Sequence, residues 1–398
     1  MVRYRAAWVL PIDRPPVPGG TVTVERGLIA RVDETVIGDA DDLGSVAILP
    51  GLVNAHTHLE LSWMRGRLPA VGSMPAWTAS LIELRRSVSN EPVEPIIAAI
   101  AEARASGTGL VGDVTNTLAT YEPLADSDLS AAVFRELIGF SAADPDAVVS
   151  AAARQIHELT PIAWLRPSIV PHAPYSVSPS LFAAIQRRAG GAPLSIHLGE
   201  SAAEIEFLRD GSGAWRTLLE SLGAWNPSWT PPGCGPVEYM DRLGLVSENL
   251  IAVHGVQFTD DELSRLAVAR ATIVACPRSN RRTAAGLPPI ERFYASGIRV
   301  AVGTDSLASV EDLNLFAEMA EIRRLAPSVP ARAILRSATQ GGAEALGFAS
   351  ELGTLEPGKR AQLLAVRLPA AVADVEEYLL SGIQPADIRW LDITNHEA

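Results

Sequence analysis

From residue 52 onward, short apolar runs rich in β-branched residues alternate with longer stretches in which Ala, Leu, Glu and Arg recur at helical spacing. The first pattern is typical of buried strands and the second of helices, so their alternation predicts repeated βα units around a parallel sheet. We expect helices at 77–87, 93–105, 179–189, 260–269, 313–325 and 331–346. We expect eight strands, at 52–55, 109–114, 131–138, 165–170, 194–198, 250–253, 271–275 and 298–303.

The two chain ends have a different pattern. Up to about residue 47 the chain reads as short strands separated by turns, and one more strand is expected at 362–366, after a turn-rich stretch. We therefore predict an α/β protein in which 48–349 form a catalytic (β/α)8 TIM-type barrel. Residues 1–47 and 350–398 together are expected to build a small β-sandwich domain.

The amino-acid composition argues against some classes of binding partner for this protein. The chain has 398 residues, 47% hydrophobic and 20% charged, which is typical of a globular enzyme. Its 46 acidic side chains exceed its 33 basic ones, which argues against nucleic-acid binding because phosphate neutralisation needs clustered Lys and Arg. No stretch resembles a signal peptide and no run of about 18 apolar residues occurs, so we expect a cytoplasmic protein without a membrane partner.

Cysteine and lysine usage restricts the chemistry. Cys234 and Cys276 are two isolated cysteines, too few for a disulfide framework or a four-cysteine zinc site. Only Lys359 among the 33 basic residues is a lysine, and it stands in a Gly/Pro-flanked turn. Schiff-base chemistry and metal bridging by a carbamylated lysine are therefore disfavoured. Any metal site must use histidines and carboxylates.

Titratable side chains gather at the predicted strand ends. In a parallel barrel, catalytic groups come from the carboxyl ends of the strands and from the loops that follow them. Five of the seven histidines lie within or just after predicted strands, and an aspartate follows the eighth strand. These residues are His56, His58, His172, His197, His254 and Asp305. Taken singly, each could be an ordinary core or turn residue, so their shared position at strand ends is the informative feature.

Two motifs connect these residues to a known superfamily. His56 and His58 are two apart on an extended segment, so both imidazoles can share one ion. Their segment, Pro50-Gly-Leu-Val-Asn-Ala-His-Thr-His-Leu-Glu-Leu-Ser62, resembles the first metal motif of the amidohydrolase superfamily. The His-x-x-Glu spacing from His197 to Glu200 is similar to its aminohydrolase branch, and without the resemblance Glu200 would read as a helix-start carboxylate.

The resemblance implies a one-metal hydrolase. Its metal ligands would be His56, His58, His197 and Asp305, and its catalytic residues Glu200, His254 and Asp305. Such a ligand set favours a single divalent ion, zinc first and iron or manganese as alternatives, that lowers the pKa of water towards about 7. Asp305 would then accept the water proton, Glu200 would protonate a substrate ring nitrogen, and His254 would hold the attacking hydroxide.

Further segments resemble deaminases of adenine nucleosides. Residues 171–176 and 276–280 are similar to those of methylthioadenosine/S-adenosylhomocysteine deaminases and aminodeoxyfutalosine deaminases. The resemblance favours 6-amino-6-deoxyfutalosine, a substrate of menaquinone synthesis that carries a benzoate. The expected substrate-binding residues are Trp77, His172, Glu200, Arg85, Arg86 and Arg278. The arginines would suit the carboxylate, although exposed helix arginines explain Arg85 and Arg86 equally well.

Several alternatives stay open. The metal motif equally fits methylthioadenosine/S-adenosylhomocysteine, triazine, guanine or cytosine hydrolases, and a catalytically silent binding barrel is a rival of another class. We expect a small-molecule substrate and a homodimer. The insert at 211–235, which is rich in Trp, Pro and Gly, could form a lid over the catalytic face or a packing loop.

Overall fold

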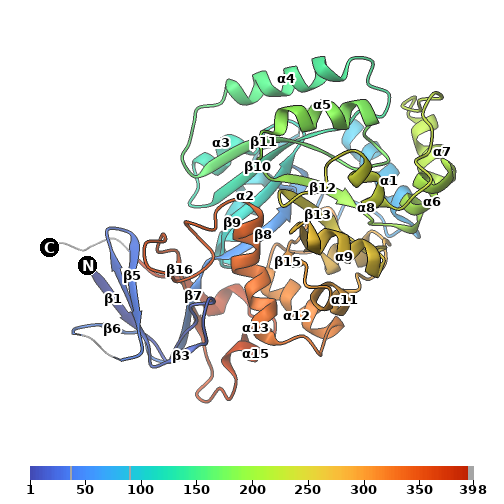
Figure 1. Cartoon of the computed structure of the whole chain (residues 1–398). Coiled ribbons are helices and arrows are strands. Elements are labelled where there is room, and N and C mark those ends of the chain that lie inside the picture. Colours follow the sequence, from blue (N-terminus) through green and yellow to red (C-terminus); the bar gives the residue numbers. More distant parts are fainter. Residues whose placement is uncertain (36–37, 89–90, 393–398) are drawn as a thin grey trace.

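The eight strands expected from residue 52 onward form two parallel sheets. The computed structural model describes residues 1–35, 38–88 and 91–392. All eight strands expected after residue 52 are present, in two four-stranded parallel sheets ordered β11-β10-β9-β8 and β12-β13-β14-β15 (Figure 1). Their bounds are β8 Leu52–Thr57, β9 Thr108–Thr115, β10 Ser130–Leu137, β11 Leu165–Pro171, β12 Leu194–Leu198, β13 Leu250–His254, β14 Thr272–Ala275 and β15 Arg299–Val302.

The two sheets meet at two seams. β11 lies against β12, and β15 lies against β8. At the carboxyl end of each seam one backbone hydrogen bond joins the sheets, from His197 N to His172 O (2.9 Å) and from Asp305 N to His56 O (3.0 Å). The parallel α/β class is confirmed. A continuous eight-stranded ladder is not formed among the described residues, because hydrogen bonding across the seams is confined to the strand ends.

Helices lie outside the parallel sheets (Figure 1). The helix expected at 331–346 is interrupted by a π-helical turn, Ser337–Gly341, where the backbone passes so close to β15 that a Cβ on Gly341 would lie 2.5 Å from Val300 O. No helix in the described residues combines the length and apolarity needed to cross a bilayer. The α-helices are α1 Met74–Arg86, α2 Glu94–Ala105, α3 Tyr121–Ala125, α4 Pro145–His157, α5 Pro179–Ala189, α6 Ala202–Asp210, α7 Gly213–Ser221, α8 Pro236–Arg242, α9 Asp260–Val268, α10 Pro277–Arg282, α11 Ile290–Ala295, α12 Leu315–Leu325, α13 Ala331–Arg336, α14 Gly342–Ala345 and α15 Val375–Leu379.

Both chain ends contribute to the smaller sheets. One sheet has the order β5-β4-β1-β6 and the other β17-β16-β7-β2-β3, and β16 pairs antiparallel with β7, so the two ends meet as expected. Strands of both sheets contribute to one apolar cluster that includes Val22 and Ile48. The sandwich form and the domain limits remain predictions. The strands are β1 Val2–Arg5, β2 Trp8–Val9, β3 Val17–Pro18, β4 Thr21–Glu25, β5 Leu28–Asp33, β6 Asp41–Asp42, β7 Val46–Pro50, β16 Leu363–Arg367 and β17 Ile388–Trp390.

The seam between β15 and β8 has no room for a side chain at Gly303. The side chains of Asn54 and Thr304 bridge this seam, with Asn54 Nδ2 donating to Thr304 Oγ1 (2.7 Å) and Thr304 N donating to Asn54 Oδ1 (3.0 Å). A Cβ on Gly303 would lie 2.8 Å from His56 O and 2.9 Å from His56 Cβ. The glycine therefore sets the distance between His56 and the strand that precedes Asp305.

We expect Gly303→Ala to lower the free energy of unfolding by about 1–3 kcal/mol, because an extra methyl group in a closely packed interior forces the backbone to shift. Urea denaturation of the two proteins measures the difference. Gly72→Ala is the matched control, since no atom lies within 4 Å of its Cβ position, and it should change stability by less than about 0.5 kcal/mol. Equal stability of both variants would contradict this account of the seam.

Candidate active site

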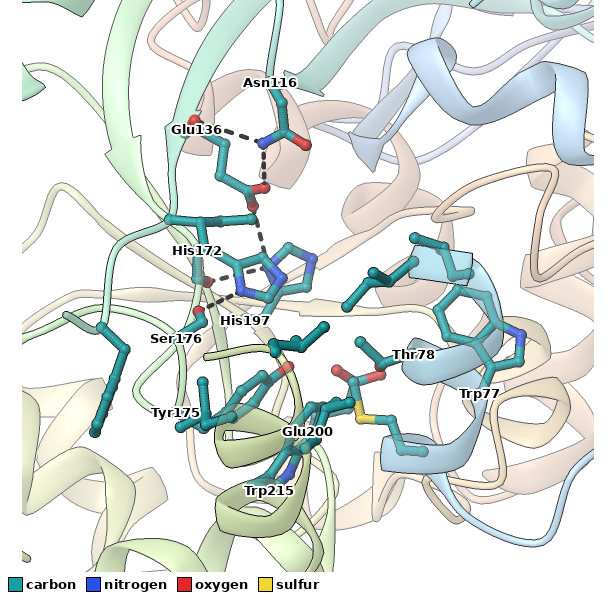
Figure 2. Close-up of a pocket in the computed structure, with 18 of the residues that line it drawn as sticks. Trp77, Thr78, Asn116, Glu136, His172, Tyr175, Ser176, His197, Glu200 and Trp215 are labelled. Carbon is teal, nitrogen blue, oxygen red and sulfur yellow. Dashed lines mark hydrogen bonds and ion pairs between the residues drawn. The ribbon is translucent and has the colours of Figure 1, made fainter. Parts of the chain in front are cut away.

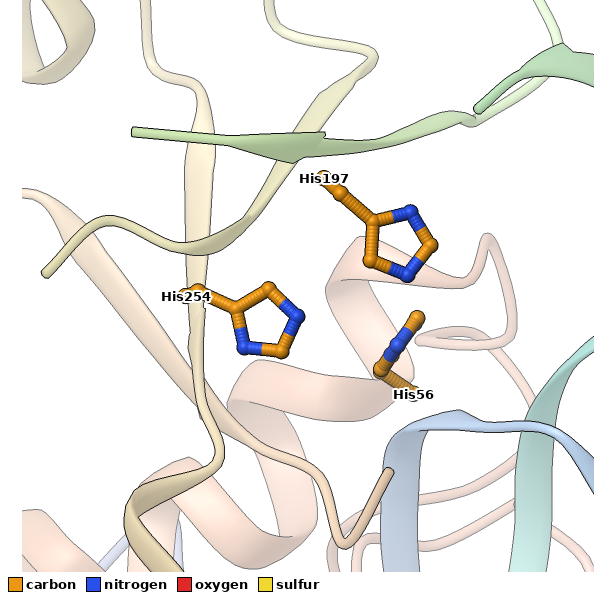
Figure 3. Close-up of side chains that lie close together, drawn as sticks. All are labelled: His56, His197 and His254. Carbon is orange, nitrogen blue, oxygen red and sulfur yellow. The ribbon is translucent and has the colours of Figure 1, made fainter. Parts of the chain in front are cut away.

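Four histidines and one aspartate converge at the carboxyl ends of the strands. His56 lies next to the last residue of β8, His58 follows the strand, His197 lies in β12 and His254 ends β13. Figure 3 shows the rings of His56, His197 and His254 turned toward one another. His58 Nε2 lies 3.2 Å from His197 Nε2, and Asp305 Oδ1 lies 3.8 Å from His56 Nε2 and 3.6 Å from His58 Nε2.

An unusual backbone conformation orients the side chains of His254 and Asp305. The backbone of His254 and of Asp305 has a positive φ, 77° and 61°, and residues other than glycine rarely adopt such values. Strained backbone of this kind persists where surrounding structure fixes it, and it is concentrated at functional sites. Around Asp305 the surrounding structure is a set of donors: Ser306 N donates to Oδ1 (2.8 Å), and the hydroxyl groups of Ser279 and Ser309 donate to Oδ2.

The histidines are neutral at pH 7. Burial lowers the pKa of His58 and of His197 to about 4. Burial, followed by the neighbouring histidines, lowers the pKa of His56 and of His254 well below the usual range. Neutral imidazole is the form that binds metal ions.

The cluster fits a divalent cation. Both ring nitrogens of His56 are buried and have no hydrogen-bond partner in the described protein, which is costly for a polar group unless a ligand completes it. Ligand atoms at 2.0–2.1 Å around a tetrahedral ion lie roughly 3.3 Å apart. The separations of 3.2–3.8 Å among His56, His58, His197 and Asp305 match that spacing. The described side chains therefore support a divalent metal ion.

A neighbouring group offers a poorer site. Glu136, His172 and His197 also bring ligand atoms close together. However, His197 Nδ1 lies 3.1 Å from the carbonyl oxygen of His172 and can donate its proton there, which leaves Nε2 as the ligand atom facing His58. Glu136 Oε1 lies 3.6 Å from the same Nδ1. We interpret Glu136 and His172 as groups around the cluster and not as ligands.

Glu200 stands beside the cluster in a buried position that disfavours the charged form of its carboxyl group. Its side chain is 2% exposed, Oε1 lies 3.6 Å from His254 Nε2, and Oε2 has no partner in the described protein. Burial, followed by repulsion from Asp305 and Glu204, raises the pKa of Glu200 well above its usual range. The turn that carries it is held by Glu204, which accepts hydrogen bonds from Gly199 N and Glu200 N, each 2.9 Å long.

A cavity of about 300 Å³ opens beside these residues. Figure 2 shows Glu136 and Asn116 on one side of it, Glu200, Tyr175 and Trp215 on another, and Trp77 across from them. Its outer walls are mostly apolar, and this size is within the range of small-molecule sites. The apolar lining residues include Leu61, Met74, Trp77, Leu81, Ile82, Ile138, Phe140, Trp215, Leu218, Leu219 and Leu222.

Of the expected substrate-binding residues, Trp77, His172 and Glu200 line the cavity, whereas Arg86 and Arg278 do not. Arg278 instead pairs with Glu318 (2.7 Å) and Asp312 (2.9 Å).

Arg85 lines the cavity but its guanidinium is already engaged. It donates to Glu60 and Glu91, and its Nη1 donates to Asn116 Oδ1 (2.8 Å). Four donor contacts occupy four of the five N–H groups of a guanidinium. The expected pairing of Arg85 with a substrate carboxylate is therefore not supported, because the two glutamates neutralise it.

The insert at 211–235 forms a wall of the cavity. Trp215 in α7 lines it and stacks on Tyr175 with ring centroids 3.7 Å apart. Trp229 stacks on Phe207 with centroids 4.7 Å apart, so this part of the insert packs into the core. Whether the insert moves as a lid stays a prediction.

Glu136 is the residue that sequence reasoning missed. It is 4% exposed, lines the cavity, and accepts a hydrogen bond from Asn116 Nδ2 (2.9 Å). A sequence signal for it exists, because Glu136 is an acidic residue near the carboxyl end of a mostly apolar strand, where parallel barrels carry functional groups.

Comparison with known proteins agrees with this geometry. The model of the amidohydrolase family matches residues 47–385. The chain is 32% identical to a 5-methylthioadenosine/S-adenosylhomocysteine deaminase of Nitratidesulfovibrio vulgaris, over 87% of this chain and 80% of the relative. It is 31% identical to an aminodeoxyfutalosine deaminase of Deinococcus radiodurans, over 83% and 82%. A zinc-bound adenosine deaminase structure from Xanthomonas campestris is 28% identical, with a TM-score of 0.83 over 97% of this chain and 90% of that one.

We expect the protein to bind one divalent ion per chain and His58→Ala to bind it at least about 100-fold more weakly, because the variant loses a directly coordinating nitrogen. Metal analysis after chelation, reloading and gel filtration measures the stoichiometry, and competition with a chromogenic chelator measures the affinity. His157→Ala, on the exposed end of α4, is the control and should bind like the unchanged protein. Full metal binding by His58→Ala would contradict the assignment of the cluster.

Proposed function

This chain belongs to the amidohydrolase family, and from that premise we propose that it removes the exocyclic amine of an adenine nucleoside by hydrolysis. The family and the deaminase relatives make it a hydrolase of carbon–nitrogen bonds. The observation that carries the proposal is the buried carboxyl group of Glu200 beside the histidine cluster, because amine release from a ring needs a proton donor next to activated water.

His56, His58, His197 and Asp305 would hold a divalent cation, and zinc is proposed because of the zinc-bound relative. Such a cation would supply activated water by lowering its pKa towards about 7. Asp305, whose Oδ2 is held by Ser279 and Ser309, would accept the proton of that water. His254 presents its Nε2 beside Glu200 and holds the incoming oxygen.

Glu200 supplies the proton that makes the ring reactive. Because burial raises the pKa of its carboxyl group and so favours the protonated form, Glu200 can donate to the ring nitrogen next to the amine-bearing carbon. A carbon–oxygen bond then forms at that carbon, and the carbon–nitrogen bond breaks as the amine takes a proton and leaves as ammonia. Glu200 and Asp305 carry the protons between these steps.

Glu136 and Asn116 are suited to the hydroxyl groups of a ribose. Glu136 Oε2 accepts from Asn116 Nδ2 (2.9 Å), and Oε1 lies 3.6 Å from His197 Nδ1. A buried carboxylate oxygen on a cavity wall is a strong acceptor for a hydroxyl group. Asn116 is fixed in turn by Arg85, so the pair is held ready for a substrate.

We propose 6-amino-6-deoxyfutalosine as the natural substrate, which would place the chain in menaquinone synthesis. The Deinococcus relative and the aromatic and aliphatic walls of the cavity, which include Trp77 and Trp215, support an aryl substituent on the nucleoside. Methylthioadenosine and S-adenosylhomocysteine are the second candidates, because the Nitratidesulfovibrio relative has similar identity and an apolar chamber also suits a thioether.

We expect Glu200→Gln to lower kcat for ammonia release roughly 100- to 10,000-fold, because the amide cannot donate a carboxylic proton to the ring. The assay compares 6-amino-6-deoxyfutalosine, methylthioadenosine, S-adenosylhomocysteine, adenosine, guanine and cytosine with metal-loaded protein. Glu220→Gln, exposed on α7, is the control and should retain full activity. Inert wild-type protein with its metal present would show that the adenine-nucleoside proposal is wrong.

We expect Glu136→Gln to lower kcat/KM roughly 10- to 100-fold for the best ribonucleoside, because a hydrogen bond to a charged acceptor is lost. For its 2′,3′-dideoxy analogue the same change should alter kcat/KM by less than about 3-fold. Glu158→Gln, exposed at the end of α4, serves as control. Equal losses on both substrates would mean that Glu136 acts through His197 and not on the sugar.

A further inference from the structure

We propose that Asn280 fixes the tautomer of His254, so that His254 donates a hydrogen bond from Nε2 into the site and does not coordinate the metal ion. This inference deepens the proposed function and rests on it. Asn280 lies in α10, is fully buried, and places Nδ2 3.0 Å from His254 Nδ1. No role for Asn280 follows from the metal cluster or the cavity, because it belongs to neither.

The orientation of the Asn280 amide follows from its surroundings. Oδ1 is buried without a hydrogen-bond partner in the described protein, and Nδ2 faces His254. The reversed amide would leave both N–H groups of the NH₂ without an acceptor, whereas the present orientation leaves one N–H and the carbonyl oxygen. Buried unpaired donors are rarer in proteins than under-satisfied carbonyl oxygens, so the NH₂ group belongs beside the imidazole.

The amide determines where the imidazole proton lies. A nitrogen that accepts a hydrogen bond carries no proton, and neutral imidazole has one protonated nitrogen, so the proton is on Nε2. His254 Nε2 has no partner in the described residues and lies 3.6 Å from Glu200 Oε1, too far for a hydrogen bond.

The Nε2–H group therefore decides the role of His254. His56, His197 and His254 bring nitrogen atoms close enough to share an ion, but a protonated nitrogen cannot coordinate a cation. The ion is left to the other histidines and Asp305. A neutral imidazole with its N–H aimed into the site can instead hold the attacking oxygen or stabilise charge that develops on it.

The same short helix positions the proton acceptor. Ser279 precedes Asn280, and its hydroxyl donates to Asp305 Oδ2 while also lying 2.9 Å from the hydroxyl of Ser309. Two consecutive residues of α10 thus orient a catalytic carboxylate and a catalytic imidazole. These two contacts give a physical reason for the residues found at 276–280, the segment that resembles deaminase sequences.

Asn280→Asp is the decisive variant, because it keeps the size of the side chain and replaces the donor by an acceptor. The carboxylate should draw the proton to Nδ1 and leave a bare lone pair on Nε2. We expect kcat to fall by at least about 100-fold with KM changed less than about 3-fold and the metal content unchanged. Asn280→Ala, which leaves the tautomer free, should fall between Asn280→Asp and wild type. Asn249→Asp, at the opposite end of β13, is the control.

A second measurement reads the tautomer directly. Long-range ¹H–¹⁵N spectra of metal-loaded protein with ¹⁵N-labelled histidine distinguish the two tautomers, and the His254→Gln spectrum identifies the signals of His254. We expect an Nε2–H tautomer in wild type and an Nδ1–H tautomer in Asn280→Asp. An Nδ1–H tautomer in wild type, or equal kcat in the Asp and Ala variants, would overturn the proposal. If no nucleoside is deaminated, the proposed function fails, and the spectra still decide the tautomer.

Discussion

The complete burial of His56 is the constraint on which the rest of the site depends. Neither of its ring nitrogens has a partner in the described protein, although a buried polar group without one costs about 1–3 kcal/mol. His58, His197 and Asp305 gather around it at ligand spacing, and burial keeps the imidazoles neutral. A divalent cation satisfies all of these groups together. The fold thus buries polar groups at a cost in free energy, and a bound cation would offset that cost.

Residues around the proposed metal ligands determine whether Glu200, Asp305 and His254 donate or accept protons. Glu204 holds the backbone turn of Glu200, and burial raises the pKa of Glu200, which favours a proton donor next to the cation-binding cluster. Asp305 is kept as an acceptor by serine hydroxyl groups, and the amide of Asn280 keeps His254 as a donor. Donors and acceptors are therefore fixed before a substrate arrives, which is the preorganisation that enzymatic proton transfer requires.

The sequence predicted what local pattern and strand order determine. All eight strands were found because apolar runs alternate with helical stretches, and the motif residues converge because they follow those strands. Contacts between side chains that are far apart in the sequence could not be predicted from local pattern. Arg85 lines the cavity, but its charge is neutralised by ion pairs with Glu60 and Glu91, which come from other segments of the chain. Glu136 belongs to no motif, and only the fold brings it to the cavity.

The most direct test of the central claim is an anomalous difference map from crystals of the zinc-loaded protein, recorded at the zinc absorption edge. The account predicts one peak per chain, within about 2.0–2.3 Å of nitrogen atoms of His56, His58 and His197 and an oxygen of Asp305. A peak coordinated by His254 Nε2, or one in the neighbouring group of Glu136 and His172, would contradict it.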